Sequence, residues 1–382
     1  MNSKDIEVST KGNTMTKLKD LVPLADWFPE IDQEHWVISG PCSAESEEQV
    51  LNTARKLKVC NCVDIFRAGI WKPRTRPDSF EGVGEMGLHW LKHVKEETGL
   101  RIAVEVAHPS HVDMALKYEV DLIWIGARTT SNPFSVQELA DHLAGTNLPV
   151  LVKNPVNPDI SMWIGALERF YNAGIRKIGA VHRGFYPFEP TKLRNIPKWE
   201  IPIELKTQIH HLPIFCDPSH IAGVRDYLQE ISQKAMDLNM NGLMIESHEN
   251  PAKALSDKKQ QLTPGDLGAL LGNIVFRSMD SNNQRFTNVL EALREQIDSL
   301  DKQILELLAQ RMNTVEEIGK YKSENKVTIL QLRRWEKIIE SRIRHGMKLG
   351  LTKDFIKGLL QLVHKESIQK QTDIMNQRQQ GK

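Results

Sequence analysis

Side chains able to hold a metal ion are spread widely along this 382-residue sequence. One thiol, one imidazole and two carboxylates come from four separate segments: Cys42, His220, Glu246 and Asp257. Such a set suits a divalent transition metal, because sulfur and nitrogen favour manganese, iron, cobalt or zinc over magnesium or calcium. Taken singly, each residue has an ordinary explanation, such as a packed cysteine or a turn with a capping aspartate. The sequence predicts a metal centre only if the fold brings the four together.

Basic side chains form a second group of candidates. Its members are Arg67, Lys72, Arg74, Arg128, Lys153 and Arg183. Six converging cations would repel one another without a multiply charged anion, and guanidinium groups match the geometry of phosphate. The group therefore predicts phosphorylated substrates, although Arg74 or Arg76 alone is equally well explained as a solvent-exposed loop charge.

Eight short runs rich in β-branched residues are separated by helix-like stretches. They are His35–Ser39, Val63–Arg67, Ile102–Val106, Leu122–Ile125, Val150–Lys153, Lys177–Val181, Pro213–Cys216 and Gly242–Glu246. Short runs that are apolar on both faces indicate parallel strands covered by helices, and eight such strands close a barrel. We expect an α/β fold, a (β/α)₈ TIM barrel over about residues 27–276.

The two groups of candidates share one position relative to these runs. In a parallel barrel the chemistry lies at the C-terminal ends of the strands. Polar residues end or follow every run, whereas charges that merely marked loops would be scattered equally at both ends. We therefore expect the metal candidates and the basic candidates to converge at one mouth of the barrel.

The motifs around these residues resemble those of the type I 3-deoxy-D-arabino-heptulosonate 7-phosphate (DAHP) synthases, in their short branch. They are GPCSAE (40–45), RAGIWKPRT (67–75), IGAR (125–128), LVKN (151–154), HRG (182–184), DPSH (217–220), GLMIESH (242–248) and ALSDKKQQLTP (254–264). The resemblance covers nearly the whole barrel, and GPCS, KPRT and DPSH in this order are highly specific. It implies condensation of phosphoenolpyruvate with erythrose 4-phosphate and release of phosphate, the first step of the shikimate pathway.

The resemblance also assigns roles to the candidates. Cys42, His220, Glu246 and Asp257 would hold the metal, for which manganese is our first choice and iron, cobalt or zinc the alternatives. Phosphoenolpyruvate would be held by Arg67, Lys72, Arg128, Lys153 and Arg183. Erythrose 4-phosphate would face Lys72, Arg74 and Thr75, with Lys72 also the catalytic candidate of the barrel. The sequence departs from many members of the family at Arg76, where they carry a small residue.

The alternative for the barrel is the related 3-deoxy-D-manno-octulosonate 8-phosphate synthases. These share the barrel, the enol donor and the metal position but take arabinose 5-phosphate. The KPRT motif favours the DAHP synthases, because the sister family usually has a different sequence there.

The last third of the chain has a different composition. All 18 prolines precede Gly265, and a long proline-free stretch is typical of an all-α module because proline costs about 3 kcal/mol inside a helix. We place a barrel domain at residues 1–276, of which roughly the first 25 form an extension, a linker at 277–287 and a helical domain at 288–382. Helices are expected from near Thr287, over Leu332–Met347, and from Thr352 to beyond Gln371.

The helical region carries the series Leu293-Arg294, Ile297-Asp298, Asp301, Leu307-Leu308, Arg311, Ile318-Gly319, Lys322, Arg334, Ser367 and Gln371. This series resembles the all-helical chorismate mutases over about Val289–Thr372. The resemblance implies rearrangement of chorismate to prephenate without a cofactor, with catalytic roles for Arg311, Lys322 and Gln371. The other pocket residues would be Arg334, Ser367 and, reaching into the partner subunit's site, Arg294. The family often has a glutamate after the arginine matched by Arg334, whereas this chain has Trp335.

Two other readings of the helical region remain open. The first expected helix carries a long apolar stripe, consisting of Leu293, Ile297, Leu300, Ile304, Leu307, Met312 and Val315. Three helices cannot bury so many apolar residues alone, which predicts a homodimer. The region could accordingly be a dimerisation arm only, or a sensor that binds chorismate or prephenate and inhibits the barrel.

Composition limits the remaining classes of function. A net charge of +1 argues against general nucleic-acid binding, and no apolar run approaches the roughly 18 residues of a membrane span. The first thirty residues lack the apolar core of a secretory signal, so we expect a cytoplasmic protein. Four cysteines are too few and too oddly spaced for a disulfide framework, so we expect any important cysteine to be a thiol.

Overall fold

The computed structural model describes residues 18–72, 80–277, 283–330 and 332–380. For residues 332–334, 336–337 and 378–380 it describes the backbone alone. The chain divides into two compact units, Met1–Met279 and Asp280–Lys382, which are described separately here.

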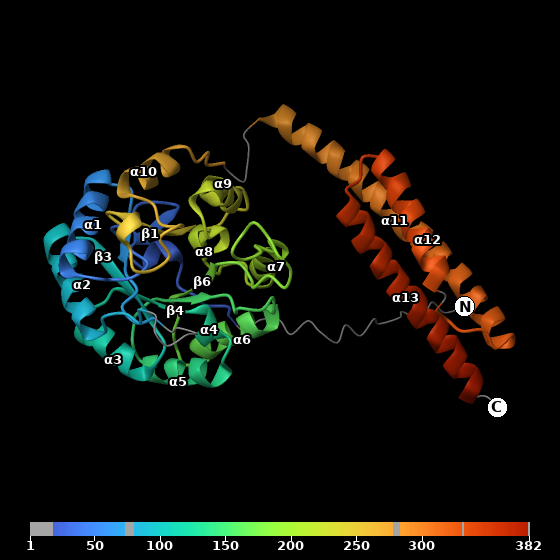
Figure 1. Ribbon diagram of the computed structural model, residues 1–382, viewed down its shortest axis with the longest axis horizontal. Coiled ribbons are helices and arrows are strands. Elements are labelled where there is room, and N and C mark those ends of the chain that lie inside the picture. Colours follow the sequence, from blue (N-terminus) through green and yellow to red (C-terminus); the bar gives the residue numbers. More distant parts are fainter. Residues whose placement is uncertain (1–17, 73–79, 278–282, 331, 381–382) are drawn as a thin grey trace. The chain divides into compact units, whose positions relative to one another are not determined.

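The first unit is a closed barrel of eight parallel strands in chain order (Figure 1). The strands are β1 (Trp36–Gly40), β2 (Ile65–Arg67), β3 (Arg101–Val106), β4 (Leu122–Ile125), β5 (Val150–Lys153), β6 (Ile178–His182), β7 (Ile214–Cys216) and β8 (Gly242–Glu246). The predicted TIM barrel is confirmed. Every strand begins and ends within two residues of its predicted first and last residue.

Helices surround the strands, as Figure 1 shows. They are α1 (Glu47–Cys60), α2 (Glu85–Thr98), α3 (Pro109–Lys117), α4 (Ala127–Thr130), α5 (Pro133–Leu143), α6 (Ile160–Asn172), α7 (Glu200–Gln208), α8 (Pro218–Ala222), α9 (Leu228–Asp237) and α10 (Pro264–Gly272). Short polar side chains fix where several of them begin. Ser46, Asn132 and Asp159 each accept a hydrogen bond from a backbone N–H in the first turn of α1, α5 or α6.

Aromatic side chains fill the interior of the barrel at its N-terminal end. Trp36, the first residue of β1, packs against Trp27 and Phe28 from the preceding segment, with ring centroids 6.2 and 5.7 Å apart. Trp124 and Phe215 belong to the same buried cluster. Because this end is packed with apolar side chains, the polar C-terminal ends of the strands form the open mouth.

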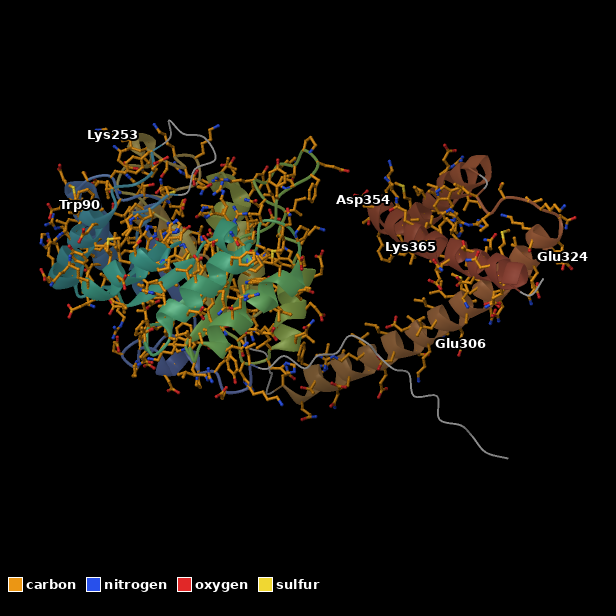
Figure 2. All side chains as sticks on the ribbon, turned by 90° about the horizontal axis from the view of Figure 1, so that it is seen from below. Trp90, Lys253, Glu306, Glu324, Asp354 and Lys365 are labelled. Carbon is orange, nitrogen blue, oxygen red and sulfur yellow. A yellow bond between two sulfur atoms is a disulfide. The ribbon has the colours of Figure 1, made fainter. Side chains whose placement is uncertain are left out.

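The second unit contains three helices, α11 (Gln284–Glu324), α12 (Leu332–Lys348) and α13 (Lys353–Gln380), as expected from the sequence. Helix α11 begins three residues earlier than predicted, because Asn283 caps it by accepting from two backbone N–H groups. Its second half packs against α13 at Val315 and Gly319, which are buried. In the first half of α11, the part of the apolar stripe from Leu293 to Leu307 is exposed. Figure 2 shows this helix at Glu306.

Cys60 and Cys62 form one local disulfide, which the sequence did not predict. The reason is the turn between them. Asn61 caps the end of α1 in the left-handed conformation, at φ 50° and ψ 35°, and so brings the two Cα atoms to 5.3 Å. Cys42 and Cys216 are free and buried. None of the helices in the described part of the chain is long and apolar enough to cross a membrane.

Candidate functional site

A polar cavity of about 320 Å³ occupies the mouth of the barrel. Its walls come from the loops that follow the strands, as expected for this fold. The lining residues are Cys42, Lys72, Glu105, Gly126, Ala127, Arg128, Lys153, Val156, Arg183, Tyr186, Arg194, Asn195, His220 and Asp257. Predicted metal candidates and predicted basic candidates thus share one cavity.

A thiol and two carboxylates form a tight group at this mouth. The ligating atoms of Cys42, Glu246 and Asp257 all lie within 4.8 Å of one another. Glu246 is the last residue of β8 and is paired in register with Gly40, the last residue of β1, two positions before Cys42. The Cys42 Sγ atom lies 3.4 Å from Asp257 Oδ2.

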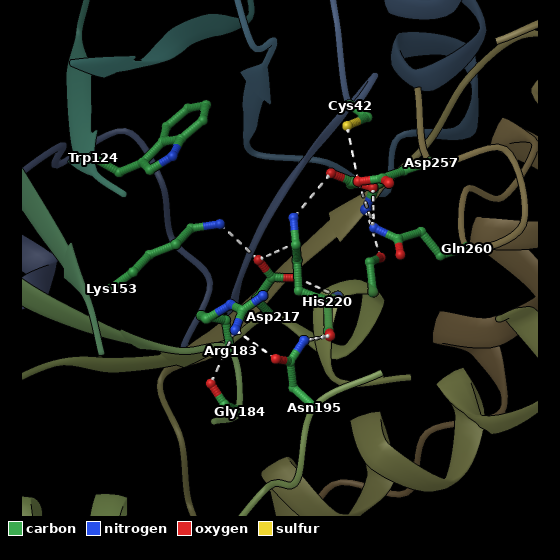
Figure 3. Close-up of polar contacts among 12 residues, drawn as sticks. Cys42, Trp124, Lys153, Arg183, Gly184, Asn195, Asp217, His220, Asp257 and Gln260 are labelled. Carbon is green, nitrogen blue, oxygen red and sulfur yellow. Dashed lines mark hydrogen bonds and ion pairs between the residues drawn. The ribbon is translucent and has the colours of Figure 1, made fainter. Parts of the chain in front are cut away.

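His220 lies beside this group, at the start of the short helix α8 (Figure 3). Its Nε2 atom is 3.8 Å from Glu246 Oε1, and its Nδ1 atom is 2.8 Å from Asp217 Oδ2. The four predicted ligands therefore meet at one place, three of them as a compact group with His220 next to Glu246.

The donor set of this group fits a divalent metal ion. Glu246 is fully buried, yet its Oε1 atom has no hydrogen-bond partner among the described residues. An unpartnered buried carboxylate oxygen is costly unless a cation completes its environment. A sulfur, an imidazole nitrogen and two carboxylates around one point are ligands of transition metals.

Burial and the neighbouring charges determine the protonation of Cys42 when no metal ion is bound. Burial, with a contribution from the Glu246 carboxylate, raises the pKa of the Cys42 thiol to about 12, and Lys72 and Arg67 oppose this shift. Lys72 Nζ lies 3.2 Å from the Cys42 Sγ atom. Burial acts to raise the pKa of Asp257 as well, but the neighbouring His220 and Arg194 hold it well below its usual value.

Cations also line the cavity. Lys153 Nζ lies 2.7 Å from Asp217 Oδ2, and both side chains are buried. Burial alone would raise the pKa of Asp217, but His220 and Lys153 hold it well below its usual value. Burial lowers the pKa of the Arg183 guanidinium to about 10, so this side chain remains charged at neutral pH.

The remaining basic candidates are placed differently. Arg67 does not line the cavity but lies behind it, 1% exposed, with Nη2 3.7 Å from Glu246 Oε1. The Arg67 guanidinium also covers the Trp124 ring at 4.8 Å. Arg74 and Thr75 lie outside the described residues.

Sequence reasoning missed four polar residues that contact the predicted site. They are Arg194 and Asn195, on the loop after β6, and Gln260 and Gln261, on the loop after β8. Asn195 accepts from Arg183 Nη1 at 2.8 Å and donates to the His220 carbonyl at 2.6 Å. In the sequence, the one feature that pointed to any of them was the position of both glutamines inside the motif ALSDKKQQLTP.

A second polar group lies between helices α11 and α13. Arg311 Nη1 donates to Ser367 Oγ at 2.7 Å, and Gln371 Nε2 donates to the Ser367 carbonyl at 3.1 Å. Ser367 and Gln371 are buried, and Gln371 Oε1 has no hydrogen-bond partner within the described part of the chain. Lys322 Nζ donates to the Ile329 carbonyl at 2.6 Å.

The structure does not bring all of the predicted helical residues to this group. Arg294 is exposed on α11 and pairs with Glu291 at 2.9 Å. The side chain of Arg334 is not among those described. Trp335, next to it, stacks on His364 of α13, with ring centroids 3.6 Å apart.

Comparison with known proteins gives two matches to family profiles. Residues 28–275 match the DAHP synthetase I family, and residues 293–372 match the chorismate mutase type II family.

Curated proteins and solved structures match the barrel. A phospho-2-dehydro-3-deoxyheptonate aldolase of Thermotoga maritima is 35% identical over 226 residues, which are 59% of this chain and 64% of that protein. A crystal structure of the enzyme of that name from this organism superposes with a TM-score of 0.56 at 31% identity, covering 68% of this chain and 70% of the other. A 2-dehydro-3-deoxyphosphooctonate aldolase of Geobacter sulfurreducens is 26% identical, over 62% of this chain and 89% of that protein. This chain thus spans just under two thirds of the first relative's length.

Proposed function

The chain belongs to the DAHP synthetase I family, and on that basis we propose that its barrel condenses phosphoenolpyruvate with erythrose 4-phosphate and releases phosphate. One observation carries this proposal. Metal-ligating side chains and a set of cations line the same cavity. Joining an enol phosphate to a phosphorylated aldehyde requires both, because charge must be stabilised at the carbonyl oxygen and at the phosphate groups.

The metal would be held by Cys42, His220, Glu246 and Asp257. When bound, it supplies a Lewis acid that polarises the carbonyl of the aldehyde. We propose manganese, with iron, cobalt and zinc as alternatives that the same ligands accept. Because the Cys42 thiol is protonated in the metal-free chain, metal binding must release its proton.

Phosphoenolpyruvate would be bound by the cations that line the cavity. Lys72, Arg128, Lys153 and Arg183 line the cavity and together can neutralise a phosphate and a carboxylate. Arg67 lies behind them, and its Nε and Nη1 atoms have no hydrogen-bond partner among the described residues. The Arg67 guanidinium therefore keeps donors for an anion bound above it.

Erythrose 4-phosphate would be bound by Lys72, Arg74 and Thr75 of the KPRT motif. The alternative acceptor is arabinose 5-phosphate, in line with the octulosonate-type relative from Geobacter sulfurreducens. The higher identity to the heptonate-type relative from Thermotoga maritima favours the four-carbon sugar.

Phosphate release distinguishes these proposals. The purified chain is incubated with phosphoenolpyruvate and either erythrose 4-phosphate or arabinose 5-phosphate, with added manganese or with a chelator. We expect release with erythrose 4-phosphate and manganese, and loss of it with the chelator or after Cys42→Ala. Cys216→Ala is the matched control, because Cys216 is equally buried but does not line the cavity. Activity that survives both the chelator and Cys42→Ala would remove the metal from the mechanism.

We further propose that the helical unit rearranges chorismate to prephenate, without a cofactor. Arg311, Arg334 and Arg294 would bind the two carboxylates, and Lys322 and Gln371 would donate to the ether oxygen, where negative charge grows in the transition state. The hydrogen bonds that join Arg311, Ser367 and Gln371 within one protomer support this proposal.

Replacement of Arg311 tests this second activity. Arg311→Ala should abolish chorismate turnover, whereas Arg344→Ala, at an exposed position of α12, should leave it unchanged. Unchanged turnover in Arg311→Ala would reject the proposed pocket.

We propose that a second copy of the chain covers the exposed stripe of α11, giving a homodimer. Leu293, Ile297, Leu300, Ile304 and Leu307 are each more than half exposed. Arg294 lies on the same stretch of helix, so the partner's copy of this helix would carry Arg294 to the other protomer's pocket.

A further inference from the structure

Gln260 lies between the two carboxylates of the proposed metal centre (Figure 3). Its side chain is 1% exposed. The Nε2 atom donates to Glu246 Oε2 at 2.8 Å and to Asp257 Oδ2 at 3.3 Å. One amide group therefore contacts both acidic ligand candidates.

These contacts determine which oxygen of the Glu246 carboxylate remains available to a metal ion. Gln260 occupies Oε2 of Glu246, and so leaves Oε1 as the oxygen without a hydrogen-bond partner among the described residues. The Oε1 atom lies 3.8 Å from His220 Nε2 and 3.7 Å from the Arg67 Nη2 atom. The amide thus sets the rotation of the Glu246 carboxylate so that its open oxygen faces the other ligands.

Arg194 holds Gln260 from the opposite side. Arg194 Nη1 donates to Gln260 Oε1 at 2.8 Å and lies 3.0 Å from Asp257 Oδ1. The Oδ2 atom of Asp257 is left on the side of the Cys42 Sγ atom. Because Arg194 is fully charged, it also offsets the repulsion between two carboxylates brought close together.

The neighbouring glutamine fixes the third ligand. Gln261 Oε1 accepts from the backbone N–H of Cys42 at 2.9 Å, and Gln261 Nε2 donates to the Ser256 carbonyl at 2.8 Å. Two consecutive glutamines on the loop after β8 therefore orient three ligands that come from three segments of the chain.

We propose that Gln260, anchored by Arg194, is the positioning residue that sets the spacing of the carboxylate ligands for a divalent transition metal. The proposal rests on the proposed function of the barrel, since it presupposes a metal bound there. Outer hydrogen bonds of this kind orient ligands, and their loss typically weakens metal binding about 10–100-fold. Gln260 itself does not line the cavity.

Manganese affinity of the full chain tests this role. The free Mn²⁺ that remains in solution is measured by electron paramagnetic resonance during titration of the wild type, Gln260→Leu and Gln137→Leu. Gln137 is a matched control, because it also donates to an aspartate, Asp141, and accepts from an arginine, Arg169, but lies outside the cavity. We expect Kd to rise about 10–100-fold in Gln260→Leu and to stay within twofold in Gln137→Leu.

A second measurement separates positioning from a general structural defect. At saturating Mn²⁺, condensation by Gln260→Leu should recover to near the wild-type rate with an unchanged KM for phosphoenolpyruvate, which a misfolded site would not do. If Gln260→Leu does not fold, Arg194→Gln replaces it, since this change removes the charge beside Asp257 and the donor to Gln260. A Kd within twofold of the wild type in the folded variant would overturn the inference. A wild-type chain that binds none of the four metals would overturn the proposed metal centre and this inference with it.

Discussion

The Nη2 atom of Arg67 lies 3.7 Å from the Oε1 atom of Glu246, and both side chains are almost completely inaccessible, at 2% and 0%. The ends of β2 and β8 meet here, on either side of β1. Arg67, which we propose binds phosphoenolpyruvate, and Glu246, a proposed metal ligand, therefore form one buried ion pair. Neither can be removed without affecting the charge balance of the other.

Removing Arg67 should destabilise the barrel as well as inactivate it. Loss of one partner from a buried ion pair leaves the other charge uncompensated, which costs about 3–5 kcal/mol. We expect Arg67→Ala to lower the free energy of unfolding by this amount in urea, measured by tryptophan fluorescence. Arg55→Ala is the control, because the Arg55–Glu97 pair is exposed and its loss should change stability little. Equal stability of the two variants would contradict the argument.

Asn195 should affect the binding of phosphoenolpyruvate through Arg183. The Asn195 side chain is buried and accepts from the Arg183 guanidinium, and hydrogen bonds to charged groups contribute about 1.5–3 kcal/mol. Asn195→Ala should therefore raise the KM for phosphoenolpyruvate by about 10-fold or more. The KM for erythrose 4-phosphate should remain as in the wild type, because Asn195 contacts no residue of the KPRT motif in the described structure. Equal increases in both constants would mean that the whole cavity is disturbed.

The barrel and the convergence of the proposed metal ligands were predictable because they follow from local patterns. Each strand is buried on both faces and so appears as a short apolar run, as in Leu122–Ile125 and Val150–Lys153. The closed topology then forces the strand ends together. This is why Cys42 and Glu246, 204 positions apart, could be assigned to one site from the sequence.

The contacts of Arg194, Gln260 and Arg67 were not predictable in the same way. Arg194 and Gln260 lie on loops, whose paths are set by tertiary contacts rather than by a repeating pattern. Arg67 ends a strand, and this position predicted that it binds an anion. It did not predict that the side chain is buried behind the cavity. The Cys60–Cys62 disulfide depends on the left-handed conformation of Asn61, a single backbone angle that composition does not reveal.

Thiol counting tests the state of the four cysteines. In the metal-free chain at pH 8, with no reductant, we expect no thiol that reacts rapidly with iodoacetamide. Cys60 and Cys62 are paired, and burial raises the pKa of Cys216 well above its usual value and that of Cys42 to about 12. Only about one Cys42 thiol in 10⁴ is then ionised at pH 8, and the thiolate is the reactive form. Reduction should expose two reactive thiols and denaturation all four. Two fast thiols before reduction would show that Cys60 and Cys62 are not bonded.

Gly319 should be essential for the helical site. A Cβ atom at this position would lie 3.2 Å from Gln371 Cγ and 3.2 Å from Ile374 Cδ1. The branched side chain of Gly319→Val would push α13 away and displace Gln371, so we expect loss of most chorismate turnover. Gly358→Ala is the control, since a Cβ there meets nothing within 4 Å and alanine favours a helix by about 0.5–1 kcal/mol. Full turnover in Gly319→Val would show that the packing of α11 on α13 does not shape the site.

Subunit mixing tests whether Arg294 acts in the partner's site. If each pocket combines Arg311 of one protomer with Arg294 of the other, Arg294→Ala and Arg311→Ala should each be inactive as pure dimers. In a mixed dimer one pocket contains both substitutions, and the other contains neither. Random mixing makes half of the dimers mixed, each with one intact pocket, so about a quarter of the wild-type chorismate turnover should return. If instead both residues served the same protomer's pocket, no mixture would regain activity. Ile297→Glu, which places a charge on the exposed stripe of α11, should abolish this recovery by preventing the exchange of subunits.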